Sequence, residues 1–321
     1  MRTHTVFMAL CATVLSLTLG AGAQAADAGK WPERPIQIIV PYGAGGDSDF
    51  NARVYAKYLE PLLGKPLAVV NVTGGGGSIA ARRAKDAKPD GYTVFFGNGG
   101  FEIGHAIGLT DFGFEAFEVA AIAARESGHY IAVNASSPWK TLKELVEDSK
   151  KQPGKISIAG SIGGASYLAA VLLNKNGAAL NIVDHGGSAT RITALLGNHV
   201  DAVPTPMVTL KDYVKNGDMR VLATMAPKRS RFVPDVPTFL ESGYPAEYQF
   251  CFYFMFPKGT PQAIVDKFAE AAEKIATTNK EYADALEKSF MQEVFFLRGK
   301  EAWKLIQSQV DIVTKADLRA K

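Results

Sequence analysis

Four short loops rich in glycine constrain the fold of this 321-residue chain more than any other feature. Each follows an apolar, strand-like run and leads directly into a helical pattern; the loops lie within 43–46, 74–77, 158–167 and 184–189. Glycine lets the backbone approach a ligand closely, and the first turn of a helix leaves amide N–H groups unpaired, so each junction suits an anion without lysine or arginine. A tight turn without a ligand explains any one loop. Four of them, two in each half of the chain, favour a small carboxylate held by backbone amides between two lobes.

Strand-like and helix-like segments alternate along nearly the whole chain, which predicts an α/β fold with mainly parallel sheets flanked by helices. The strands are expected at 36–40, 67–72, 93–96, 119–123, 130–133, 156–159, 182–183, 200–203, 221–224 and 248–256. Ser48 or Asp49 is expected to cap the first helix, and Thr260 a later one. Since no linker separates two domains, the lobes are expected to be joined by strands, near 127–133 and 248–256.

The first residues have the order of a secretory signal peptide. Arg2 precedes the apolar run 6–19, and the small-x-small sequence at 23–25 follows, so residues 1–25 are expected to be cleaved off. The run is shorter than the ~20 residues that span a bilayer, which makes a permanent anchor the weaker interpretation. Cleavage leaves Cys251 as the only cysteine, which excludes an internal disulfide and a multi-cysteine metal site. The mature protein is therefore expected to be exported to the periplasm and soluble.

Composition and motifs argue against several other classes of protein. Lys plus Arg number 35 against 32 for Asp plus Glu, so the net charge of +3 gives no electrostatic reason to expect nucleic acid. No cluster of histidines and acids has the spacing of metal ligands, and neither a metal nor a cofactor is expected. A dinucleotide fingerprint at 43–48 is incomplete, because the strand that should end in an acid ends in Asn71. An exported hydrolase stays open, with Ser161 as nucleophile in a near-elbow sequence and His185 as base.

Segments along nearly the whole mature chain resemble the substrate-binding proteins of tripartite tricarboxylate transporters, the Bug-type receptors. The similarity begins at 36–53, with Val40-Pro41-Tyr42, Gly45-Gly46 and Asp49, and continues in order through 74–80, 89–93, 153–155, 187–189, 195–201, 234–238 and 257–261. The resemblance implies a two-lobed periplasmic binding protein fold of the type II kind, with two crossover connections, that closes over a carboxylate. Residues 26–128 and 249–321 would form lobe 1, and residues 129–248 lobe 2.

The resemblance also implies which residues bind the ligand, because glycine loops of lobe 1 and facing loops of lobe 2 hold the carboxylate in that family, partly through ordered water. Carried onto this sequence, the ligand-binding residues are Tyr42, Ala44, Gly45, Gly46, Ser48, Asp49, Gly76, Asn98, Gly99, Ser161, Gly163, Ser166, His185, Gly187, Ser188 and Arg191. A carboxylate beside an anion site is repulsive, so Asp49 is expected to cap the helix instead. An amine on the ligand would bring Asp49 or Asp47 into contact with it.

The sequence departs from the family pattern mainly in the second lobe. Tyr167 stands where histidine is usual, and Arg191 replaces a usually small residue; Glu102 and Arg125 are also unexpected. Arg125 or Arg191 suits a second carboxylate through a two-pronged contact, with a solvated arginine as the alternative. The identity of the substrate therefore does not follow from the resemblance.

Together these features predict an extracytoplasmic solute-binding protein without catalytic residues. A small carboxylate enters the open cleft, the lobes close by a hinge motion, and the closed form passes the ligand to the integral-membrane permease of a tripartite carboxylate transporter. A sensor-only receptor for a signalling kinase is an alternative. The protein is expected to act as a monomer.

Overall fold

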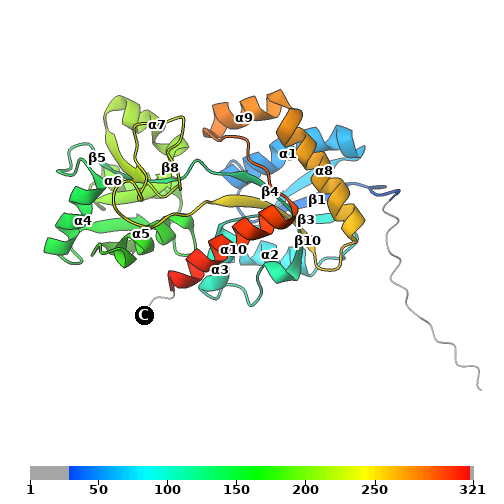
Figure 1. Cartoon of the computed structure of the whole chain (residues 1–321), viewed down its shortest axis with the longest axis horizontal. Coiled ribbons are helices and arrows are strands. Elements are labelled where there is room, and N and C mark those ends of the chain that lie inside the picture. The colour runs from blue at the N-terminus through cyan, green and yellow to red at the C-terminus, as the bar shows by residue number, and fades with distance from the viewer. Residues whose placement is uncertain (1–28, 319–321) are drawn as a thin grey trace, which may run out of the picture.

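The computed structural model describes residues 29–318, so the expected signal peptide, 1–25, lies outside the described residues. Within this range the chain forms two five-stranded sheets, each flanked by helices, which lie next to each other as two lobes (Figure 1). The predicted two-lobed α/β fold is confirmed. We call the unit around the sheet β2-β1-β3-β10-β4 lobe 1, and the unit around β7-β6-β8-β5-β9 lobe 2.

Lobe 1 combines the two ends of the described chain. Its strands are β1 (Ile36–Val40), β2 (Leu67–Asn71), β3 (Thr93–Asn98), β4 (Phe117–Arg125) and β10 (Cys251–Pro257). Its helices are α1 (Asp47–Leu63), α2 (Ser78–Lys85), α3 (Gly100–Ala106), α8 (Gln262–Thr278), α9 (Lys280–Phe290) and α10 (Gly299–Lys315), with 3-10 turns η1 (Gly75–Gly77) and η2 (Phe114–Ala116). Every residue of β10 is buried, and Phe254 packs edge-on against Tyr55 of α1 and Phe268 of α8. The aromatic strand is therefore core, which fixes α1 and α8 on one face of the sheet.

Lobe 2 is formed by the middle of the chain. Its strands are β5 (His129–Asn134), β6 (Ser157–Gly160), β7 (Asn181–Asp184), β8 (Ala202–Pro206) and β9 (Met219–Thr224). Its helices are α4 (Leu142–Lys151), α5 (Ala165–Lys175), α6 (Ser188–Leu196) and α7 (Met207–Asn216). The end of the described chain also reaches this lobe, because the Tyr167 hydroxyl donates to the carbonyl oxygen of Leu318 at 3.5 Å.

The sheets are mixed rather than mainly parallel. In lobe 1, β1 runs parallel to β2 and β3, whereas β10 runs antiparallel to β3 and β4. In lobe 2, β6 runs parallel to β7 and β8, whereas β5 runs antiparallel to β8 and β9. β5 and β10 are the strands that follow the two crossings between lobes, at 126–128 and 225–250, and each enters its new sheet against the direction of its neighbours. These strand positions support the proposed lobe boundaries.

Two predicted helix caps are wrong. α1 begins at Asp47 with Gly46 as its N-cap, and neither Ser48 nor Asp49 caps it. α8 begins after Pro261, and the Thr260 hydroxyl donates to the carbonyl oxygen of Pro257 at 2.8 Å instead of capping the helix. At α1 the side chains are engaged elsewhere, because the Ser48 hydroxyl accepts from Asn98 of β3 and the Asp49 carboxylate accepts from the Gly45 amide in the loop.

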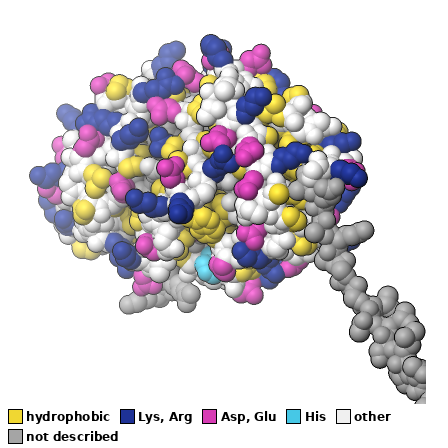
Figure 2. Space-filling model, turned by 45° about the vertical axis from the view of Figure 1, so that its right-hand side comes forward, with side chains coloured by type: hydrophobic (Ala, Val, Ile, Leu, Met, Phe, Trp, Pro, Cys, Tyr) yellow, Lys and Arg dark blue, Asp and Glu magenta, His cyan; other side chains and the backbone are white. Residues whose placement is uncertain are grey.

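The surface carries charges of both signs. In the face shown in Figure 2, the Lys and Arg side chains alternate with Asp and Glu side chains, and hydrophobic patches lie between them. Between residues 29 and 318, no helix has both the length and the apolar character needed to cross a bilayer.

Candidate ligand-binding cleft

A cleft of about 430 Å³ lies between the lobes, next to the helix starts that follow β1, β7 and β8. Its volume falls within the range of roughly 300–1,000 Å³ that is usual for small-molecule sites. The lining residues are Gly45, Gly46, Asp47, Glu126, Ser127, Ser188, Ala189, Pro206, Val208, Thr209, Phe290 and Gln292. They come from lobe 1, the β4–β5 crossing, lobe 2 and the segment after α9. The cleft is therefore built by both lobes and by one of the crossings between them.

The N-terminus of α6 presents backbone donors to this cleft. Its N-cap, Gly187, is extended and makes no side-chain cap, and no acidic residue stands in the first turn. The first helical hydrogen bond runs from Arg191 N–H to the Gly187 carbonyl oxygen at 3.2 Å, so the amides of Ser188 and Ala189 come before the helical ladder begins. Ser188 and Ala189 both line the cleft. With the positive end of the helix dipole, these amides form a site for an anion.

Arg191 supports this helix start from behind. The side chain is only 4% exposed, and its guanidinium donates to the carbonyl oxygens of Gly186 and His185 and to the Ser188 hydroxyl. Burial lowers the pKa of Arg191 to about 10, so the group keeps its positive charge at neutral pH. Arg191 therefore orders the 185–188 loop and adds positive charge behind the α6 N-terminus, while two of its nitrogens are occupied by that loop.

The N-terminus of α1 faces the same cleft, but two donors in and just before its first turn already have internal partners. Ser48 N–H donates to Asp47 Oδ1 at 2.7 Å, and Gly45 N–H donates to Asp49 Oδ2 at 2.9 Å. Asp49 also accepts hydrogen bonds from Arg53 and Asn71; although burial opposes them, these bonds and the one from Gly45 lower the pKa of Asp49. Asp47 and Asp49 thus accept the hydrogen bonds that these amides would otherwise donate to a ligand carboxylate.

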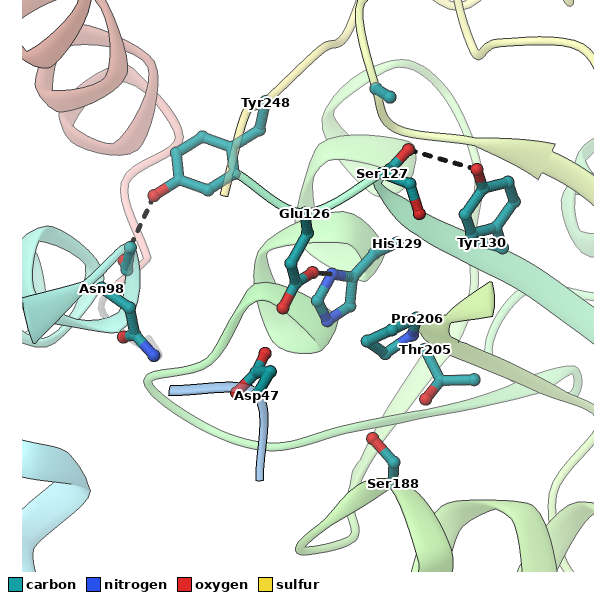
Figure 3. Close-up of polar contacts among 12 residues, drawn as sticks. Asp47, Asn98, Glu126, Ser127, His129, Tyr130, Ser188, Thr205, Pro206 and Tyr248 are labelled. Atoms are coloured by element: carbon teal, nitrogen blue, oxygen red, sulfur yellow. Dashed lines mark hydrogen bonds and ion pairs between the residues drawn. The ribbon is translucent and has the colours of Figure 1, made fainter. Parts of the chain in front are cut away.

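Asp47 stands at the edge of a buried polar cluster (Figure 3). Its carboxyl group faces Glu126 on the β4–β5 crossing, and the charge of Glu126 acts on it. Glu126 Oε2 in turn lies 2.9 Å from His129 Nδ1 at the start of β5. Burial raises the pKa of Asp47 and raises that of Glu126 to about 7, while it lowers the pKa of His129 to about 3. His129 is therefore neutral at neutral pH, and acids dominate this end of the cleft.

The other predicted residues of lobe 2 make contacts within or beside their own loops. Ser161 N–H donates to the buried Ser166 hydroxyl at 3.0 Å, and His185 N–H donates to the Gly160 carbonyl oxygen at 2.8 Å. Gly163 has a φ of +82°, and a Cβ added there would lie 3.3 Å from Ile107 of lobe 1. The 161–166 turn therefore packs against lobe 1, and its Ser161 amide is already bonded within the turn.

Several predicted residues of lobe 1 do not line the cleft. Tyr42, Gly76 and Asn98 line a separate cavity of about 10 Å³ inside the lobe. Asn98 Nδ2 donates to the buried Ser48 hydroxyl at 2.8 Å, and Gly99 N–H donates to the Cys251 carbonyl oxygen at 2.9 Å. Ala44 is exposed in the loop before α1. Gly45, Gly46 and Ser188 are thus the predicted residues that line the interlobe cleft.

The two unexpected residues Glu102 and Arg125 both have partners inside the fold. Glu102 is buried in α3 and accepts hydrogen bonds from the hydroxyl groups of Tyr248 and Tyr253, both at 2.8 Å, and burial raises its pKa to about 7. The Arg125 guanidinium lies over the Phe295 ring, 4.3 Å from its centroid, and its Nη2 is 3.7 Å from Glu293. Neither residue lines the cleft.

Most of the remaining cleft wall was not predicted from the sequence, above all Glu126, Phe290 at the end of α9 and Gln292 just after it. Phe290 reaches the site by packing on Phe50 of α1, with ring centroids 4.5 Å apart, and Gln292 accepts a hydrogen bond from Asn51 at 3.1 Å. These partners are about 240 residues apart, and no local pattern indicates such a contact. Asp47 could be suspected from the sequence, because it is an acidic residue at a helix start that follows a glycine-rich loop.

Two α/β lobes around a cleft that exposes helix N-termini define a periplasmic binding protein. A TctC solute-binding protein from Polaromonas has a similar structure, with a TM-score of 0.76 and 27% identity over 89% of this chain and 98% of that chain. MatC from Rhodopseudomonas palustris, solved with bound malate, shares the fold, with a TM-score of 0.76 and 24% identity over 89% of this chain and all (100%) of that chain.

The chain belongs to the tripartite tricarboxylate transporter receptor family, whose model matches residues 51–316. BugT of Bordetella pertussis is 31% identical to it over 281 residues, which cover 85% of this chain and 82% of that protein. The family resemblance seen in the sequence is therefore confirmed, and relatives of this kind are periplasmic solute-binding proteins.

Proposed function

We propose that this chain is an extracytoplasmic receptor that captures a small carboxylate in the interlobe cleft and passes it to the membrane permease of a tripartite carboxylate transporter. The observation that carries the proposal is the α6 N-terminus, whose Ser188 and Ala189 line the cleft ahead of the helical ladder. Membership in the receptor family supports it, as does the malate bound by a protein of the same fold, MatC.

In this proposal, a ligand carboxylate replaces water at the Ser188 and Ala189 amides of lobe 2. Gly45 and Gly46 then approach from lobe 1 as the chain bends at its two crossings, 126–128 and 225–250. Closure is favoured because the contacts from both lobes exist together only in the closed form. Cleavage after residue 25 would release a periplasmic monomer. The sensor-only alternative uses the same closure to present a surface to a kinase.

The receptor is proposed to carry out no covalent chemistry. In the described chain, no hydrogen bond joins Ser161 to His185, the pair considered for a hydrolase. An ester hydrolysed by the wild-type protein and not by Ser161→Ala would contradict the receptor proposal.

Thermal unfolding and calorimetry with a panel of carboxylates, malate first, test the function. A ligand that binds only the folded state at 100 times its Kd adds about 2.7 kcal/mol to the free energy of unfolding. Gly46→Leu should abolish this gain without unfolding the protein, because Gly46 has a φ of −78° and an added Cβ would lie 3.7 Å from its nearest neighbour, the Gly43 carbonyl oxygen.

Gly43→Leu is the matched control, since Gly43 belongs to the same loop and an added Cβ would meet nothing within 4 Å. It should bind like the wild type. The proposal fails if no carboxylate of the panel binds. If Gly46→Leu binds with unchanged affinity, Gly45 and Gly46 do not contact the ligand.

A further inference from the structure

The two ends of the cleft differ in electrostatic character. At the α6 end, helix-start amides face the cleft, and the buried positive charge of Arg191 lies behind them. At the α1 end, the cleft is lined by two carboxyl groups, those of Asp47 and Glu126. A ligand that carries only negative charge would meet attraction at one end and repulsion at the other.

Within residues 29–318, neutral His129 is the only basic side chain in contact with Asp47 or Glu126, although the charge of Arg191 also acts on Glu126 and opposes the rise in its pKa. Asp47 and Glu126 face each other (Figure 3), and burial together with the charge of Glu126 raises the pKa of Asp47, so the pair holds a proton. Two carboxyl groups this close cannot both ionise without a compensating charge. The free protein supplies that compensation with a proton, and a ligand with a positive group can supply it directly.

Glu126 also has a buried oxygen that lacks a donor. Its side chain is 5% exposed, and Oε2 comes within 2.9 Å of His129 Nδ1, yet neither atom makes a bond of hydrogen-bonding geometry. A buried carboxylate oxygen without a donor costs free energy. Glu126 lines the cleft, so a ligand there meets its side chain, although Oε2 itself faces His129 and is closed to solvent.

We infer that the ligand is an amino carboxylate, whose ammonium group binds between Asp47 and Glu126 and whose carboxylate binds at the Ser188 and Ala189 amides. This inference rests on the proposed function and narrows its ligand class. An ammonium group supplies three donors and a full positive charge, which satisfies both acids. A zwitterion lying along the cleft thus places each of its charges against the end of opposite character.

The test is calorimetry with pairs of ligands that differ only in the amine. The pairs are L-aspartate with succinate, L-glutamate with glutarate, and L-norleucine with hexanoate, and putrescine serves as a probe with amines and no carboxylate. In at least one pair, the amino member should bind the wild-type protein roughly tenfold more tightly or better, as expected for a charged hydrogen bond. Putrescine should not bind.

Asp47→Asn and Glu126→Gln keep the shape of each side chain and remove its charge. Each should remove the preference for the amino member, while the amine-free member keeps or gains affinity. Asp212→Asn on α7 is the matched control, because Asp212 is exposed and lies outside the cleft lining. It should preserve the wild-type preference. Thermal unfolding of each variant without ligand shows whether it is folded, and either of the two cleft variants suffices for the test.

The outcomes separate this inference from the proposed function. If a carboxylate binds but in none of the three pairs does the amino member bind more tightly than its amine-free partner, the inference is wrong and the carboxylate receptor stands. If the preference persists in both Asp47→Asn and Glu126→Gln, the ammonium site is elsewhere and the inference is also wrong. If putrescine binds as well as the amino acids, the carboxylate end is misassigned. If no carboxylate binds, with or without an amine, the proposed function itself fails.

Discussion

The starts of α1 and α6 face the same cleft and follow the same design, a strand, a glycine-rich loop and a helix with a glycine N-cap. Their chemistry is nevertheless opposite. Asp47 and Asp49 stand in the first turn of α1 and take the hydrogen bonds of Ser48 and Gly45, whereas α6 has no acid in its first turn. A helix start is therefore an anion site only where the chain does not supply an anion of its own.

The largest effect is expected from making α6 resemble α1. Ala189→Asp places a carboxylate in the first turn of α6, where it competes with the ligand for the same amides and repels it. Because like charges brought together in a binding site cost several kcal/mol, the affinity for the carboxylate ligand should fall about hundredfold or more. Calorimetry with the best ligand of the panel measures this fall.

Thr193→Asp is the control for that change, because Thr193 is exposed one turn further along α6. It adds the same charge to the same helix without reaching the first-turn amides, and it should change the affinity only slightly. Equal losses in the two variants would mean that net charge, and not the α6 N-terminus, governs binding.

A smaller effect is expected in the pH dependence of stability. It arises from two buried carboxyl groups, Glu126 in the cleft and Glu102 inside lobe 1. Burial raises the pKa of both Glu126 and Glu102 from 4.5 to about 7. The folded state then binds more protons than the unfolded state, so the stability present below pH 4.5 is lost as the pH rises through 7. His129 acts in the opposite direction, but only below its ordinary value of 6.5.

The melting temperature should therefore fall between pH 6.5 and about pH 8, where the two acids dominate. Asp47 and Arg191 are the charged groups that act on Glu126 besides His129, and Tyr248 and Tyr253 are the titratable groups bonded to Glu102. Glu126→Gln and Glu102→Gln should each remove part of the fall. A melting temperature that rises over this interval would contradict the assignment of both carboxyl groups.

The sequence predicted the junctions well and the contacts of their amides poorly. Every predicted strand position is occupied by a strand, and helices follow all four glycine loops, because β-branched runs and glycine-rich turns act locally. The partner of an amide is decided by tertiary placement. The Ser161 amide donates to the Ser166 hydroxyl, and the Gly99 amide donates to the Cys251 carbonyl oxygen across the sheet. Nothing in the sequence indicates that either amide already has an acceptor within the protein.

The acidic end of the cleft shows the same limit. Asp47 was visible as an acid in a helix start, but its partner Glu126 lies on the crossing between lobes, where no periodic pattern predicts which way a side chain points. The cleft residues Phe290, at the end of α9, and Gln292, just after it, depend on contacts with Phe50 and Asn51 of α1 that join distant parts of the chain.

Heteronuclear NMR of the isotope-labelled protein, titrated with its carboxylate ligand, tests the central claim most directly. The amide protons of Ser188 and Ala189 should move downfield most, because they gain a charged acceptor. The amides of Ser48, Gly99 and Ser161 should move little, because each already has an internal acceptor. Large shifts at those three amides with none at Ser188 and Ala189 would show that the carboxylate binds elsewhere and would contradict this account.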